Sequence, residues 1–208
     1  MKKLRIVPLF LFALIIFSSL VFIQIAWSAT TDFTQAITEG TLSVDIVDAS
    51  GETVVSPGVA FEEKAFSFEA QNATGTLGTS AERIRLSNPT ATAVWTVTMA
   101  ATGGTGATWT AGSFTYPYNA AAADDGRLTV NPSVGTIAGV AGCATTNVTK
   151  GDSAYFVGEG TVNVTLMSAA SGAAVGCRWD LTGVALTQRI PASQAPGNYS
   201  IGMTITAN

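Results

Sequence analysis

The chain has 208 residues, of which 12% are charged, and it contains no histidine. Ten basic against fourteen acidic residues give a net charge of −4. This balance argues against nucleic acid or an anionic membrane surface as a partner, because both need a basic face. Without histidine, the commonest general base and the commonest zinc ligand are missing, so we expect the protein not to be an enzyme.

Residues 1–28 have the pattern of a secretory signal peptide. Three basic residues among the first five precede an apolar run over residues 6–23, and Ala26 and Ser28 occupy the −3 and −1 positions of a cleavage site. The same run is nearly long enough for an uncleaved membrane anchor, so both interpretations stay open. Either way, the chain from Ala29 onward is expected outside the cytoplasm, as an extracellular, cell-surface or cell-wall protein. Cleavage leaves seven basic against fourteen acidic residues, a net charge of −7.

We expect residues 29–40 to form an N-terminal lead segment and residues 41–208 to form a single domain. The first strand of this domain is expected at residues 41–48, where apolar and polar side chains alternate. Residues 65–70 alternate as well, with Phe66 and Phe68 on one face, and predict another strand. The glycine-rich stretch that follows predicts a loop.

Residues 83–100 carry the clearest strand pattern. Two alternating segments flank Asn88 and Pro89, a pair that ends a strand because proline has no N–H to donate. We therefore expect a central hairpin. In its second strand, Trp95, Val97 and Met99 share a face, and we expect this face to point into the core.

The remaining chain continues in the same manner, and its last third is the most regular part. Strands are expected at residues 161–166, 177–181, 184–190 and 198–206. No segment after the signal peptide has a helical period of 3.6 residues. The sequence therefore predicts an all-β fold, an antiparallel β-sandwich of the jelly-roll type.

Cys143 and Cys177 are the two cysteines of the chain. In an exported protein the default state of such a pair is a disulfide. A reactive thiol would need basic or histidine neighbours, and only Arg178 adjoins either cysteine. We therefore expect a structural disulfide, with a stabilisation of about 3–4 kcal/mol for a loop of this length.

An ionic site is suggested by Asp124 and Asp125, which precede a glycine. Their carboxylates are hard oxygen ligands of the kind that calcium prefers. Asp45 with Asp48 offers a second arrangement of this kind. The Asp-Asp-Gly sequence is also typical of an ordinary turn, and we favour the turn over a calcium site. Calcium is the one candidate cofactor, and we expect no other metal.

Aromatic side chains at Trp95, Trp109, Tyr116, Tyr118 and Trp179 suit a sugar-binding face, on which rings stack against the ligand. Packing within the sandwich is the alternative. We favour packing, because Trp95 and Trp179 lie in alternating strands.

Two short motifs resemble those of WxL-domain bacterial cell-surface proteins. The sequence Ser-Asn-Pro-Thr at residues 87–90, followed by Ala-Val-Trp-Thr-Val-Thr at residues 93–98, is similar to the first Trp-x-Leu segment of that family. Ile-Pro-Ala at residues 190–192, leading to Gly-Asn-Tyr-Ser-Ile at residues 197–201, resembles its pre-terminal strand. The resemblance covers residues 40–208.

The family-motif aromatic residues are then Trp95, Trp179 and Tyr199. The first motif reads Trp-Thr-Val here, the last strand has no tryptophan, and Trp179 with Asp180 and Leu181 has the motif's letters in another place. The resemblance implies a β-rich fold and non-covalent attachment to the bacterial cell wall.

A second resemblance involves Thr-Glu-Gly-Thr-Leu-Ser-Val at residues 38–44, which is similar to the opening strand of TasA/camelysin-type matrix proteins. It implies a jelly roll that polymerises by strand donation. Residues 29–37 would be the free segment, since an exposed sheet edge accepts such a strand. An ordinary disordered terminus is the alternative.

We expect a non-enzymatic cell-surface or envelope protein that binds cell-wall polymer or a surface partner protein. The first alternative is a structural subunit of an extracellular filament or surface layer, which is a homo-oligomer. The second alternative is a carbohydrate-binding module. A membrane partner is expected only through residues 1–28, if they are not cleaved.

Overall fold

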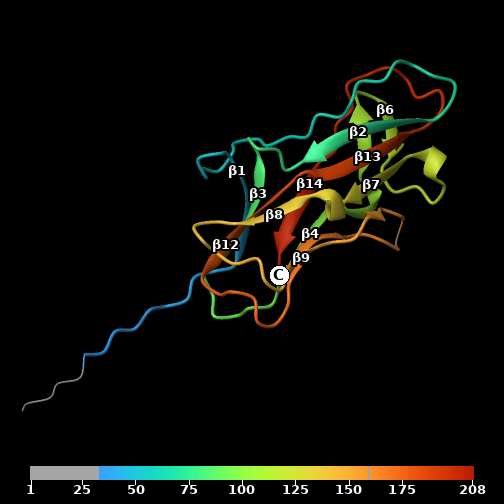
Figure 1. Ribbon diagram of the computed structural model, residues 1–208. Coiled ribbons are helices and arrows are strands. Elements are labelled where there is room, and N and C mark those ends of the chain that lie inside the picture. The colour runs from blue at the N-terminus through green and yellow to red at the C-terminus, as the bar shows by residue number, and fades with distance from the viewer. Residues whose placement is uncertain (1–32, 159) are drawn as a thin grey trace, which may run out of the picture. The chain divides into compact units, whose positions relative to one another are not determined.

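The computed structural model describes residues 33–158 and 160–208. The expected signal peptide lies outside the described residues. Residues 38–208 form one compact unit. Within the described residues, the regular structure is β-strand together with the short 3₁₀ turns η1 (Gly104–Gly106), η2 (Ala123–Asp125) and η3 (Pro132–Val134) (Figure 1). The prediction of an all-β antiparallel sandwich is confirmed.

One layer of the sandwich consists of two four-stranded antiparallel sheets. The first has the order β1 (Ser43–Val47), β3 (Arg83–Asn88), β12 (Cys177–Thr182) and β8 (Thr136–Gly139). The second has the order β10 (Ala154–Tyr155), β7 (Arg127–Asn131), β13 (Val184–Ile190) and β2 (Gln71–Leu77). The chain runs from β2 into β3, from β7 into β8 and from β12 into β13, so the two sheets continue one another as a bent layer. Only Gly183 separates β12 from β13, at a φ of 75° that favours glycine.

The opposite layer has the order β14 (Met203–Ala207), β4 (Trp95–Ala101), β11 (Val164–Ala169) and β9 (Val148–Lys150), again antiparallel. The hairpin of β5 (Thr108–Ala111) and β6 (Phe114–Pro117) extends this layer. A bridge between Thr110 and Ser200 joins the hairpin to the chain that enters β14.

The expected central hairpin is wrong, although both of its strands exist. β3 and β4 belong to opposite layers. The buried side chain of Asn88 explains why the chain passes from one layer to the other. It accepts a hydrogen bond from the N–H of Thr90 at 3.1 Å and donates one to the carbonyl of Thr92 at 2.8 Å. The side chain therefore shapes a connection that leads the chain away from β3.

The strand expected at residues 65–70 is also wrong. This segment is a loop, and the side chains of Phe66 and Phe68 are 51% and 78% exposed. The strand is β2, which begins at Gln71 and includes Gly75, where we expected a loop. A Cβ atom at Gly75 would lie 3.1–3.3 Å from Val59 and Phe61, so the missing side chain lets these residues pack over the strand.

The core lies between the two layers. The expected core face of β4 is confirmed, since Trp95, Val97 and Met99 are buried. The ring of Trp95 packs against that of Trp179 on β12, with 5.2 Å between centroids. Further buried members come from both layers and include Ile84, Leu86, Leu128, Val130, Phe156, Val164, Leu166, Met167, Leu181 and Leu186.

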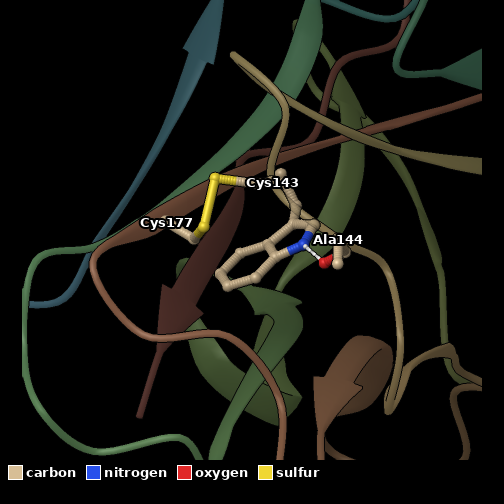
Figure 2. Close-up of a disulfide and its surroundings, with 4 residues drawn as sticks. Cys143, Ala144 and Cys177 are labelled. Atoms are coloured by element: carbon tan, nitrogen blue, oxygen red, sulfur yellow. Dashed lines mark hydrogen bonds between the residues drawn. A yellow bond between two sulfur atoms is a disulfide. The ribbon is translucent and has the colours of Figure 1, made fainter.

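The expected disulfide between Cys143 and Cys177 is present, with the two Cα atoms 5.7 Å apart (Figure 2). It joins the loop after β8 to the start of β12. Beside it, the carbonyl of Ala144 accepts a hydrogen bond from the indole Nε1 of Trp179 at 2.9 Å. A disulfide of this kind is typical of proteins in an oxidising compartment.

Candidate binding site

A half-open cleft with a volume of about 580 Å³ lies at one end of the unit formed by residues 38–208. Its walls are the loop over residues 61–67 and the connection over residues 190–199, which leads from β13 towards β14. Both walls are irregular segments held on rigid strands, the usual arrangement for binding residues.

The floor of the cleft is aromatic. Trp109 and Tyr116 stack with an interplanar angle of 15° and 6.1 Å between centroids, and Tyr199 packs on Tyr116 at 5.0 Å. Burial raises the pKa of the Tyr116 phenol, so this group stays protonated across the physiological range.

A buried amide fixes the position of the floor. The indole Nε1 of Trp109 donates a hydrogen bond to Oε1 of Gln188 at 2.8 Å, and Nε2 of Gln188 donates to the carbonyl of Arg189 at 2.8 Å. Gln188 is only 2% exposed, and these two bonds satisfy both ends of its amide. The floor is therefore preorganised.

Uncharged polar groups lie along the walls. Nε2 of Gln71 donates to the carbonyl of Ala65, and Nε2 of Gln194 donates to the hydroxyl of Tyr199, which itself donates to the carbonyl of Ala195. Asn198 also lines the cleft, and its side-chain amide makes no hydrogen bond within the part of the chain that the structure describes. The side-chain oxygens of Gln71 and Gln194, and the whole side-chain amide of Asn198, are therefore free to bind a ligand.

The carboxylate and ammonium groups on the walls, among the described residues, are those of Glu62, Glu63 and Lys64. Nζ of Lys64 donates to Oε1 of Glu62 at 2.6 Å. This bond lowers the pKa of the Glu62 carboxyl, which keeps the pair ionised.

An apolar groove of about 340 Å³ adjoins the cleft, and both are lined by Phe61, Trp109 and Tyr199. Side chains before and on β14 form one side of the groove, and core side chains form its base: Ile201, Met203, Ile205, Leu128 and Leu186.

β14 is the terminal strand of its sheet within the described residues. Thr96 and Asn208 exchange two backbone hydrogen bonds, at 2.8 and 2.9 Å. Because such pairs alternate along an antiparallel ladder, the N–H and C=O groups of Met203 and Ile205 point away from β4, towards the open edge. The groove therefore combines an apolar surface with unpaired main-chain groups at the edge of β14, and β1 is a close neighbour of that edge.

The structure separates the aromatic residues that the sequence analysis singled out. Trp95, Tyr118 and Trp179 are buried in the core, which confirms packing for these three. Trp109 and Tyr116 are buried in the hairpin of β5 and β6 but line the cleft from below. Tyr199 is part of the cleft wall, so the three family-motif aromatics do not lie together.

Asp124 and Asp125 lie in the short turn η2, which ends at Gly126 with a φ of 110°. The carboxylate of Asp124 forms an ion pair with Nε of Arg189 at 2.7 Å. At the second candidate calcium site, formed by Asp45 and Asp48, Oδ1 of Asp48 accepts four hydrogen bonds within its own turn. In the described part of the chain, no three His, Cys, Asp or Glu side chains gather as a metal-binding group.

Gln71, Gln188, Gln194 and Phe66 are site residues that were not predicted from the sequence. The available signal was the proline-rich, polar stretch over residues 191–197, from which no binding site was predicted. Loops of this kind, placed between strands, often carry binding residues.

Family models, curated proteins and solved structures were compared with the chain, and none of them matches. Over residues 33–158 and 160–208, the chain contains no helix that is both long and apolar enough to cross a membrane.

Proposed function

We propose that this is a non-enzymatic cell-surface or envelope protein whose cleft binds cell-wall polymer. The observation that carries the proposal is the combination of a preorganised aromatic floor with uncharged amide groups on the walls. Binding sites for small or extended polar ligands are typically concave and largely apolar, with a few polar groups that fix orientation.

The carboxylates of the cleft favour binding over hydrolysis. Hydrolysis of a glycosidic bond uses two carboxyl groups that face one another across the ligand. Here Glu62 is paired with Lys64, and Glu63 is the next residue of the same loop, so the two carboxylates come from one wall of the cleft.

Co-sedimentation of the purified protein with isolated cell walls tests the proposal. We expect the protein to pellet with walls and to stay in solution without them. Phe66→Ala removes an exposed side chain from the cleft and should weaken pelleting, whereas Phe114→Ala removes an equally exposed phenylalanine elsewhere, on β6, and should not. A protein that stays soluble in both tubes would contradict wall binding.

The groove supports a second candidate function, a filament or surface-layer subunit that assembles by strand donation. The open edge of β14 can accept a strand, and the side chains of Phe33 and Ile37 in the lead segment are 94% and 88% exposed. Such a segment from a second copy would place apolar side chains in the groove and main-chain hydrogen bonds on the edge.

Electron microscopy and sedimentation velocity test this second function. A subunit of this kind is expected to form ordered fibres, and Phe33→Ser combined with Ile37→Ser is expected to abolish them. Val55→Ser combined with Val134→Ser is the control, because these side chains are also exposed but lie outside the groove and the lead segment. A monomer at all concentrations would reject strand donation.

A further inference from the structure

The charge of the cleft restricts the kind of polymer that fits. Lys64 is the only cationic side chain on its walls among the described residues, and it is already paired with Glu62. Glu63 then leaves the walls with a net negative charge. An anionic polymer would meet repulsion from this carboxylate and would have to compete with Glu62 for the one ammonium group.

The hydrogen-bonding groups of the cleft match an uncharged ligand rich in hydroxyl or amide groups. The side-chain nitrogens of Gln71 and Gln194 each donate to a protein group, whereas their side-chain oxygens accept no hydrogen bond from the described residues and are free acceptors. Asn198 offers a donor and an acceptor together. Acceptors of this kind bind hydroxyl groups without requiring a charge.

Phe66 supplies an apolar platform at the edge of the cleft. Its side chain is 51% exposed, and Phe68 packs against it edge to face, with 5.1 Å between centroids and an angle of 85°. An edge-to-face neighbour holds a ring in place while leaving ring surface free. Phe66 lines the same cleft as Trp109 and Tyr116 and adds to its apolar surface.

We propose that the cleft recognises an uncharged glycan, with Phe66 as a stacking platform and the wall amides as hydroxyl or N-acetyl partners. This inference rests on the proposed wall-binding function and names the class of polymer: neutral polysaccharide, not anionic wall polymer.

The experiment measures binding of the protein to insoluble chitin and cellulose, which are uncharged, and to polygalacturonate, which is anionic. We expect binding to at least one uncharged polymer, with less than about a twofold change between 50 and 500 mM salt, because no charge pair is screened. Phe66→Ala should lower the association constant about tenfold. Phe114→Ala should leave it within about twofold, because this exposed side chain lies outside the cleft.

Binding to polygalacturonate alone, weakened by salt, would overturn the neutral-glycan inference and leave wall binding standing. Pelleting with cell walls, but with neither uncharged polymer, would overturn it in the same way. Failure to bind walls and all three polymers would overturn the proposed function itself. Equal binding by Phe66→Ala and the unsubstituted protein would show that Phe66 is not a stacking platform for the glycan.

Discussion

The two tryptophans whose rings pack against each other in the core, Trp95 and Trp179, differ in the hydrogen bonding of their indole N–H groups. The indole N–H of Trp179 donates to the carbonyl of Ala144. The indole N–H of Trp95 is buried and has no hydrogen-bond partner within the described residues. A buried polar group without a partner costs about 1–3 kcal/mol.

We therefore expect Trp179→Phe to lower the free energy of unfolding by about 1–2 kcal/mol more than Trp95→Phe does. Both side chains are at most 2% exposed, so the loss of packing is similar and each variant is a control for the other. Urea denaturation of the two variants measures the difference. Equal losses would show that the two indole N–H groups are equivalent.

A buried ion pair provides the second test at this scale. Arg85 donates to both carboxylate oxygens of Asp180, at 2.7 and 2.8 Å, and this contact raises the pKa of the guanidinium. The two side chains are 11% and 7% exposed. Arg83 lies 3.5 Å from the same carboxylate, so removal of Asp180 takes the paired carboxylate from both arginines and leaves the largely buried guanidinium of Arg85 without it.

Asp180→Ala is expected to lower the free energy of unfolding by about 3–5 kcal/mol. Asp124→Ala breaks a pair in which the carboxylate side chain is 70% exposed, and it should cost less than about 1 kcal/mol. Thermal or chemical denaturation compares the two. Similar small losses in both variants would mean that the buried pair contributes no more than a surface pair.

The sequence could not predict the burial of Asp180. Alternation along β12 places Trp179 and Leu181 in the core and Asp180 on the outer face. On that face the register aligns Asp180 with Arg85 of β3, and Arg85 with Asp45 of β1. These neighbours come from distant parts of the chain, so a local pattern gives no sign of them.

At the scale of strands, alternation predicted which residues face the core more reliably than which strands pair. The core face of β4 was predicted correctly, because apolar alternation is a property of the strand itself. Its pairing with β3 was wrong, because the bonds of Asn88 that lead the chain to the other layer depend on the geometry of the loop. The cleft was missed for the same reason, since its walls are loops.

One glycine determines how β8 ends. Gly139 lies opposite Trp179 of β12, and a Cβ atom at this position would overlap the backbone carbonyl of Cys143. The missing side chain lets the chain fold back on itself and bring Cys143 to Cys177.

Gly139→Ala is accordingly expected to destabilise the protein by about 1–3 kcal/mol, because backbone has to move. Gly106→Ala is the matched control, since no atom lies within 4 Å of its added Cβ atom, and it should stay within about 0.5 kcal/mol of the unsubstituted protein. Melting temperatures of both variants measure the effect. An unchanged value for Gly139→Ala would contradict the close approach.

For the molecule as a whole, the disulfide is the strongest single constraint on the unfolded chain. Its two cysteines are 34 residues apart in the sequence. Replacing both by serine should lower the free energy of unfolding by about 3–4 kcal/mol, and reductant added to the unsubstituted protein should have the same effect. Chemical denaturation with and without reductant provides the comparison. Stability that is independent of reductant would contradict this role.

The chain segment between the two cysteines contributes strands to both layers of the sandwich. The segment between Cys143 and Cys177 contains β9 and β11 of one layer and β10 of the other. A protease that cuts once within this segment leaves both products covalently joined through the two sulfur atoms. In an oxidising compartment, where the disulfide persists, a nicked molecule would thus stay in one piece and keep strands of both layers tethered to each other.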